Sequence, residues 1–91
     1  MLIAGHHSLL KEIEMIEFRD WKSGETENEY LHGTKIAYIS LGEESYGLIV
    51  VTPWQVIHIE EIPQYGGEPR YYRRWEGTVE EAVKFIKETF T

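Results

Sequence analysis

The chain has 91 residues, 42% of them hydrophobic, and this length and composition predict a single small folded domain over residues 1–91. Sixteen acidic residues against nine basic ones give a net charge of −7, which disfavours non-specific binding to nucleic acids and membranes because the protein repels phosphate groups. The absence of cysteine excludes disulfides, thiolate metal sites and cysteine nucleophiles, and no apolar run is long enough to cross a membrane.

The acidic residues and the N-terminus indicate where the protein works. Glutamate supplies 15 of the 16 acidic residues, and asparagine, glutamine and methionine together number only five. This thermophile-like composition is typical of proteins from hyperthermophiles. The first residues lack the basic and apolar regions of a signal peptide, so we expect a cytoplasmic protein.

The first predicted element lies at residues 9–21. Its apolar residues stand near helical spacing, but they also alternate as in a strand once one β-bulge is allowed after Met15. We favour the strand and leave the helix open. A polar loop is predicted at residues 22–33.

Four segments rich in β-branched and aromatic residues predict strands in the middle of the chain. They span residues 35–41, 46–52, 54–62 and 70–75. The segments between them are short and rich in turn residues, and Pro53 is barred from the middle of a sheet. Because short connections join neighbouring antiparallel strands, we expect a meander of four to five strands.

The last predicted element is a helix at residues 78–90. Its apolar stripe consists of Val79, Ala82, Val83, Ile86 and Phe90. Thr78, with Glu81 three residues later, forms a capping box at the start of this helix. We therefore predict an α+β fold, with an antiparallel meander sheet and one C-terminal helix packed on one face.

The middle strands are apolar on both faces. Leu48 and Val50 point to one face and Ile49 and Val51 to the other, whereas a sheet with one wet face should alternate cleanly. The helix covers one face only, so the N-terminal segment, a curled half-barrel or a second subunit must cover the other. From this pattern we expect a homo-oligomer, most simply a homodimer.

Three of the four arginines gather with aromatic residues at residues 70–75. The candidate binding residues are Arg70, Tyr72, Arg73, Arg74 and Trp75. Arginine and aromatic side chains on a strand can contact phosphates and stack on bases. Alternatively, the arginines pair across the sheet with Glu60 and Glu61, which a hairpin would bring opposite residues 70–72. We favour the cross-strand interpretation because nucleic-acid-binding domains are usually basic.

His58 and Glu60 lie two residues apart in a predicted strand and therefore on one face. They are weak candidates for a metal site, or for a base and the carboxylate that orients it. The simpler interpretation is a partly buried histidine with a carboxylate neighbour. The sequence contains no motif for a serine nucleophile, a phosphate-binding loop, a dinucleotide fold or a zinc protease, which favours a non-enzymatic protein and predicts no cofactor.

Residues 25–29 read ETENE, so three glutamates alternate along this segment. In an extended segment they could bind a divalent cation or mimic phosphates toward a basic partner. We favour a solvated loop that keeps the protein soluble, as is usual for runs of charged residues.

The segment EGTVEEAVKFIKE (residues 76–88) resembles the helix entry of HicB-type antitoxin domains, in which glycine and threonine lead from a strand into an EEA helix. The resemblance covers about a seventh of the chain, and YYRRWEG stands where that family has a proline-glycine turn. The order of three strands and a helix is similar to that of double-stranded-RNA-binding domains, which implies RNA binding. Their last helix starts with a basic motif, whereas this one starts with Glu80 and Glu81.

These patterns predict a small cytoplasmic, non-enzymatic protein–protein interaction module that self-associates. The alternative is a nucleic-acid-binding module that uses residues 70–75. A second alternative is a metal-binding or hydrolytic site around His58. No membrane association is expected.

Overall fold

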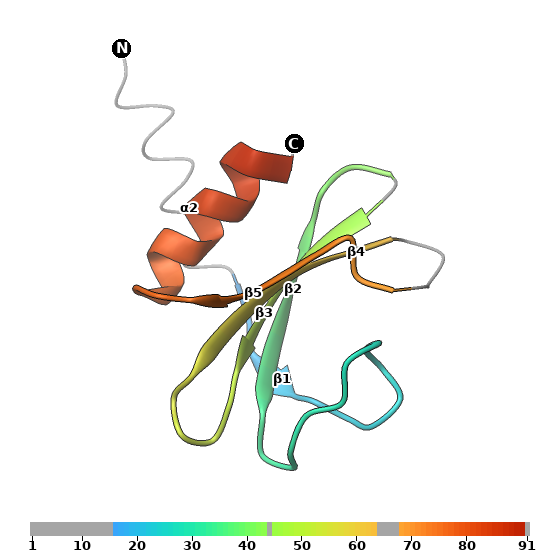
Figure 1. The fold of residues 1–91 in the computed structure, drawn as a ribbon, viewed down its shortest axis with the longest axis vertical. Coiled ribbons are helices and arrows are strands. Elements are labelled where there is room, and N and C mark those ends of the chain that lie inside the picture. Colours follow the sequence, from blue (N-terminus) through green and yellow to red (C-terminus); the bar gives the residue numbers. More distant parts are fainter. Residues whose placement is uncertain (1–15, 44, 64–67, 91) are drawn as a thin grey trace.

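The fold is that of a computed structural model, which describes residues 16–43, 45–63 and 68–90 (Figure 1). Its elements are β1 (Arg19–Asp20), β2 (Lys35–Ser40), β3 (Ser45–Val51), β4 (Ile57–Pro63), β5 (Tyr71–Trp75) and α2 (Val79–Phe90). The strands form one antiparallel sheet in the order β1-β2-β3-β4-β5, and α2 packs on β3 and β4. The predicted α+β fold, a meander sheet with one C-terminal helix, is confirmed.

Strand β4 begins later than the sequence predicts. The carbonyl oxygen of Thr52 accepts a hydrogen bond from the backbone N–H of Gln55 (2.9 Å), and the Thr52 hydroxyl accepts one from that of Val56 (3.0 Å). Gln55 has a φ of 69°, so the chain is still turning at this residue. The strand therefore starts at Ile57, and the prediction that it starts at Trp54 was wrong because Trp54 stands on the turn.

Helix α2 begins as its capping box predicts. The backbone N–H of Glu81 donates to Thr78 Oγ1 (3.1 Å), and the backbone N–H of Thr78 donates to the Glu81 carboxylate (2.9 Å). These bonds lower the pKa of Glu81. The middle of the predicted apolar stripe, Ala82, Val83 and Ile86, is fully buried against the sheet.

Close packing of the helix on the sheet depends on Gly47 in β3. A Cβ atom at this position would lie 2.5 Å from Ile86 Cγ2, which is far too close for two carbon atoms. Ile39, Ile49 and Ile59, one from each of three neighbouring strands, complete the core beneath the helix. Glycine at position 47 therefore lets the helix reach these side chains.

The face of the sheet opposite α2 is covered in part by the segment between β1 and β2 (Figure 1). Its second buried cluster consists of Trp21, Ile36, Leu48 and Val50, with Tyr30 packed against it. The segment predicted as a polar loop therefore closes over the apolar half of this face. Over this cluster, the cover comes from the same chain.

The structure describes only the end of the strand predicted at residues 9–21. Arg19 pairs with Ile36 of β2, and Asp20 pairs with Lys35, as the strand interpretation expects. Residues 9–15 of this prediction lie outside the described residues.

Candidate binding surface

The loop between β1 and β2 is fixed on the sheet by contacts within itself. The indole N–H of Trp21 donates to Thr26 Oγ1 (2.9 Å), and the Thr26 hydroxyl donates to the carbonyl oxygen of Asn28. The Trp21 ring meets the Tyr30 ring edge-on, with centroids 5.8 Å apart. Tyr30 in turn lies 6.0 Å from the ring of His58 on β4. These contacts place Asn28 and Tyr30 beside the strand that carries the predicted site residues.

Two glutamates of residues 25–29 hold this loop together. The Glu25 carboxylate pairs with Arg19 at 2.6 Å, and the arginine lowers the pKa of Glu25. Glu29 accepts a hydrogen bond from the Ser23 hydroxyl (2.6 Å). Glu27 and Glu29 are exposed and Glu25 is partly exposed, and two of these glutamates also make the contacts that hold the loop together.

The pairing of β4 with β5 brings several predicted site residues together on the face opposite α2. His58 stands opposite Arg74, and Glu60 stands opposite Tyr72, as the predicted hairpin requires. The Tyr72 hydroxyl lies 2.9 Å from His58 Nδ1, and the two rings meet edge to face with centroids 5.4 Å apart. These four residues form one neighbourhood on the sheet.

Two hollows open at this neighbourhood, and both are lined by Asn28 and Tyr72. The aromatic hollow, as we call the first, has a volume of about 310 Å³ and is lined by Asn28, Glu29, Tyr30, Leu31, Thr52, Trp54, His58 and Tyr72. The acidic hollow, about 330 Å³, is lined by Glu27, Asn28, Glu68, Pro69 and Tyr72. The surface therefore has an aromatic end and an acidic end that meet at the Asn28–Tyr72 position.

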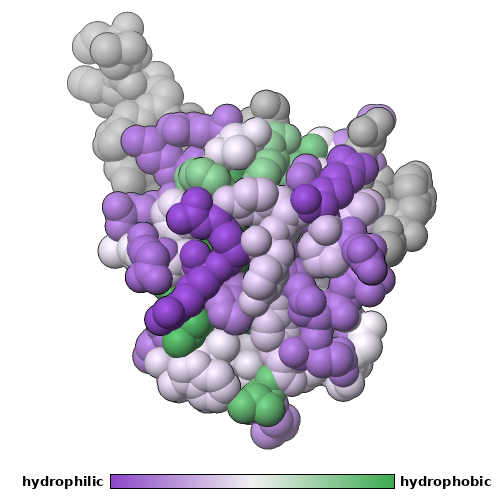
Figure 2. All heavy atoms as spheres, viewed as in Figure 1, coloured by the Kyte–Doolittle hydropathy of each residue, from purple (hydrophilic) through white to green (hydrophobic). Residues whose placement is uncertain are grey.

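The aromatic hollow gathers most of the exposed large hydrophobic side chains of the described residues. These side chains are Phe18, Leu31, Tyr38, Trp54 and Tyr72. Three of the five line the aromatic hollow: Leu31 is 59% exposed, Trp54 57% and Tyr72 49%. On the face that Figure 2 presents, hydrophilic side chains cover most of the area and hydrophobic ones form small separate areas. An exposed aromatic group of this kind is a feature of binding surfaces.

Glu60 lies buried beneath this surface. It is 0% exposed, between Leu48 on β3 and Tyr72 on β5. Within the described part of the chain, no hydrogen bond of ordinary geometry reaches either of its carboxyl oxygens. Burial raises the pKa of Glu60, and the nearby side chain of Asn28 opposes this rise by favouring the charged form. The net effect favours a neutral carboxylic acid.

The groups around His58 favour its neutral form. Burial, and then the charge of Arg74, lower the pKa of His58, while burial and the nearby Glu60 raise the pKa of Tyr72. The histidine is therefore favoured as neutral and the tyrosine keeps its proton. We assign the Tyr72 hydroxyl as the donor to His58 Nδ1, which leaves the imidazole proton on Nε2.

The predicted binding residues divide between the two faces of β5. The guanidinium of Arg73 lies over the rings of Trp75 (5.3 Å) and Phe85 (5.6 Å), so Arg73 and Trp75 belong to the helix side. Tyr72 and Arg74 point to the opposite face, where Tyr72 lines both hollows. The structure therefore does not bring all five candidates into one site.

The cross-strand ion pairs suggested by the sequence are not seen among the described residues. Glu60 and Glu61 stand opposite tyrosines rather than arginines. Among residues 16–43, 45–63 and 68–90, the ion pair of Arg74 is a loose one with Glu76, at 3.9 Å and with both side chains exposed, and Arg70 is also exposed. The guanidinium groups of Arg70 and Arg74 are therefore accessible to a ligand or partner.

His58 and Glu60 share one face of β4, as predicted, but no third metal ligand lies near them in the part of the chain that the structure describes. Among residues 16–43, 45–63 and 68–90, no group of three or more His, Cys, Asp or Glu is placed to hold a metal ion. His58 Nδ1 is already engaged by Tyr72.

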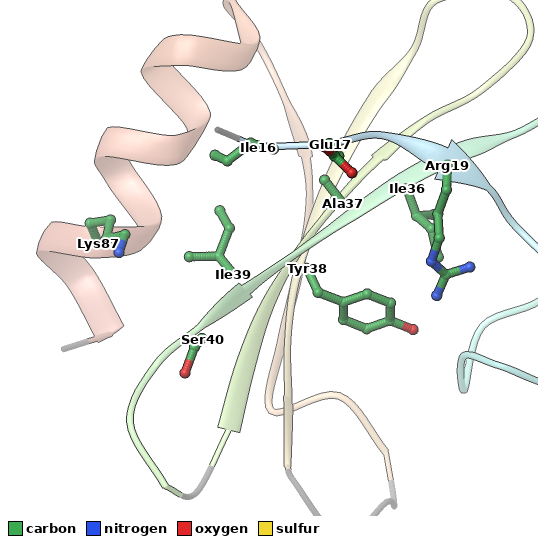
Figure 3. Close-up of a pocket in the computed structure, with 9 residues that line it drawn as sticks. All are labelled: Ile16, Glu17, Arg19, Ile36, Ala37, Tyr38, Ile39, Ser40 and Lys87. Atoms are coloured by element: carbon green, nitrogen blue, oxygen red, sulfur yellow. The ribbon is translucent and has the colours of Figure 1, made fainter. Parts of the chain in front are cut away.

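Another hollow, of about 470 Å³, is lined by residues of β2, by the segment around β1 and by Lys87 of α2 (Figure 3). Ile16 and Ile39 point toward the side of Lys87, whereas Arg19 and Tyr38 lie on the other side of β2. The Arg19 guanidinium stands 5.4 Å from the Tyr38 ring and also anchors the loop between β1 and β2. The arginine of this hollow therefore serves the fold.

The structure is a small α+β fold with exposed aromatic side chains gathered around one hollow. In comparisons with known proteins, no protein-family model matches the chain, and no curated protein or solved structure matches it either. The local resemblance at residues 76–88 therefore gains no wider support. No helix in the described ranges is long and apolar enough to span a membrane.

Proposed function

We propose that this protein is a non-enzymatic protein–protein interaction module whose partner is a second copy of itself. The observation that carries the proposal is the concentration of Leu31, Trp54 and Tyr72 around the aromatic hollow. Burying exposed apolar surface is favourable by about 25 cal/mol per Å², and tryptophan and tyrosine are the side chains that most often dominate binding energy at interfaces.

The charges around these rings support a pairing of two identical copies. Arg74 stands opposite His58 at the aromatic end, whereas Glu27 and Glu68 line the acidic hollow, and Tyr72 lines both hollows. In a two-fold symmetric pair, each surface meets its own copy turned around. A two-fold axis near Tyr72 therefore places the arginine end of each copy against the acidic end of the other.

The proposed contact differs from the dimer contact that the sequence predicts. The sequence required a cover for the second face of the sheet, and the loop carrying Trp21 and Tyr30 covers the apolar half of that face. What is left exposed is the edge of that cover, where Trp54 and Tyr72 are half exposed. The proposed contact is therefore local to β4, β5 and the turn before β4.

Sedimentation velocity over a range of micromolar concentrations tests the proposal. We expect the wild type to show a concentration-dependent dimer, and Trp54→Ala to weaken it by at least about tenfold, as removal of a central aromatic side chain usually does. Phe18→Ala is the matched control, because Phe18 is also exposed but lies outside both hollows. A wild type that stays monomeric throughout, or equal effects of the two variants, would refute the proposal.

A charge exchange tests the orientation of the pair. Arg74→Glu should weaken the dimer, and adding Glu27→Lys to the same chain should restore it, because the two ends meet in the proposed arrangement. Lys84→Glu makes the same charge change on the exposed side of α2 and should have little effect. Failure of the double variant to recover would reject this orientation while leaving the role of Trp54 to its own test.

A further inference from the structure

We infer that the aromatic hollow binds a base of single-stranded nucleic acid, with the flanking phosphates on Arg74 and Arg70. Its volume of about 310 Å³ is at the lower end of the range for ligand sites. Trp54 and Tyr72 line it and are 57% and 49% exposed, and the Tyr72 ring also meets the His58 ring edge to face. Exposed aromatic rings stack on bases of any sequence because every base has a π-face. The ligand differs in class from the partner proposed above.

The wall of the aromatic hollow also contains hydrogen-bond donors and hydrogen-bond acceptors. His58 carries a proton on Nε2, the nitrogen that Tyr72 does not engage. The Tyr30 hydroxyl is buried and has no hydrogen-bond partner within the described residues. The Asn28 side chain adds an amide donor and an amide acceptor. Base edges likewise carry donors and acceptors, so a stacked base can form hydrogen bonds with the accessible polar groups of this wall.

Two cations flank the stacking position. Arg74 follows Tyr72 by two residues in β5, so both project from the same face. Arg70 lies at the bend directly before β5, where its backbone N–H donates to the carbonyl oxygen of Glu61 (2.8 Å). Both arginines are exposed, and neither is neutralised across the sheet by Glu60 or Glu61. Guanidinium groups in this position suit the phosphates on either side of a stacked base.

The negative net charge of the protein limits the length of nucleic acid that this site can bind, but it does not exclude the binding of a single base. The net charge of −7 repels a long phosphate backbone, which predicts contact with a few nucleotides and weak binding to a duplex. Glu29 lines the hollow, but its carboxylate accepts hydrogen bonds from the Ser23 hydroxyl and the Gly24 backbone N–H. The carboxylate in the wall is therefore already engaged by the loop.

Base binding and self-association would use the same rings. Trp54 cannot stack on a base and pack against a second copy at once, so the two events compete by mass action. If the protein is a dimer, a saturating oligonucleotide should shift it toward the monomer. If the protein is a monomer, base binding is unaffected and can be measured directly.

Fluorescence anisotropy with a short fluorescein-labelled oligothymidylate, at low salt, tests the inference. We expect saturable binding by the wild type and a loss of about fivefold or more for Trp54→Ala, which is what removal of one stacking contact gives. Arg74→Ala should also weaken binding and reduce its salt dependence. Arg73→Ala is the matched control, because Arg73 lies on the helix side over Trp75 and Phe85, and it should bind like the wild type.

Four results would overturn the inference. They are the absence of saturable binding, equal binding by wild type and Trp54→Ala, equal binding of a duplex of the same length, and full displacement by inorganic phosphate at matched ionic strength. The last would mean an anion site without base stacking. Sedimentation of the protein without ligand tests self-association separately, so a monomer that binds the oligonucleotide would reject the proposed function and support this inference.

Discussion

The burial of Glu60 makes a prediction about the stability of the protein. The residue is 0% exposed, and no hydrogen bond of ordinary geometry reaches its carboxyl oxygens from the described residues. A buried polar group without a partner costs about 1–3 kcal/mol, and more if it is charged. A glutamine here would also leave its side-chain amide without a partner, so the gain from Glu60→Gln comes from removing the ionisable group, and each unit by which burial raises the pKa is worth about 1.4 kcal/mol. We therefore expect Glu60→Gln, which keeps the shape, to be more stable than the wild type by about 1 kcal/mol or more at pH 8.

The sign of the pH dependence follows from the direction of the shift. Burial raises the pKa of Glu60 above its ordinary value of 4.5, so the native state holds a proton that the unfolded chain has released. Between 4.5 and the raised pKa the unfolded state binds fewer protons, so the free energy of unfolding of the wild type falls as pH rises. Below 4.5 the carboxyl is neutral in both states and this loss disappears. The advantage of Glu60→Gln should therefore shrink as pH falls toward 4.5.

His58 changes the pH dependence of the free energy of unfolding in the opposite direction, so its contribution must be distinguished from that of Glu60. Burial and Arg74 lower its pKa below 6.5, so at acid pH the unfolded state binds more protons and the free energy of unfolding rises with pH up to 6.5. This contribution is common to the wild type and Glu60→Gln. The difference between the two proteins therefore isolates Glu60.

Urea denaturation of both proteins from about pH 4 to about pH 8 measures this difference. Glu61→Gln serves as the control, because it removes one negative charge from the adjacent residue on the other face of β4. A gain for Glu60→Gln that stays constant over this range would refute the linkage argument. A variant less stable than the wild type at every pH would refute the claim that this carboxyl is buried without a partner.

Two further predictions test the packing of α2. Gly47→Ala should lower the free energy of unfolding by about 1–3 kcal/mol, because its Cβ would meet Ile86 Cγ2 at 2.5 Å and the buried isoleucine has little room to move; an unchanged midpoint in urea would contradict the close approach. Thr78→Ala should cost about 1 kcal/mol through loss of the bond to the backbone N–H of Glu81; a midpoint within experimental error of the wild type would show that this cap contributes nothing.

The elements that the sequence predicted well are those specified by local signals. The apolar stripe around Val83 and the capping box at Thr78 each lie within one stretch of chain, and both appear where expected. The β4–β5 pairing was also predicted, because consecutive strands joined by a loop rich in glycine and proline pair antiparallel about that loop, which brings Glu60 opposite residues 70–72. Local patterns of this kind need no knowledge of distant contacts.

Trp54 was misplaced because the turn after Val51 is longer than its proline indicates. Pro53 marks the start of the reversal, but nothing in the sequence requires Gln55 to take a positive φ. The hydrogen bonds that Thr52 makes with Gln55 and Val56 extend the turn to Val56. A hydrophobic tryptophan next to a strand pattern was therefore assigned to the strand, although it stands exposed on the turn.

The candidate surface could not be predicted because it depends on contacts between residues far apart in the chain. The sequence paired His58 with Glu60, but the partner of His58 is Tyr72, and Tyr30 comes from a loop predicted to be solvated. The one available signal was Trp21 at the start of that loop, since a large apolar residue beside a polar run needs a place to be buried. Its burial against Ile36 and Val50 is what brings the loop onto the sheet.

The anchoring of this loop also explains why one half of the sheet face is left open. Its buried anchor, Trp21, packs with Ile36, Leu48 and Val50 on β2 and β3, where the apolar side chains of this face are concentrated. On the same face of the sheet, β4 carries His58 and Glu60, and β5 carries Tyr72 and Arg74. These side chains offer the loop little apolar surface to cover. The loop therefore reaches only as far as Asn28 and Tyr30, and Tyr72 remains half exposed at its border. A partner or a base that completes this face must combine an apolar ring with polar or charged groups, because the exposed half presents both.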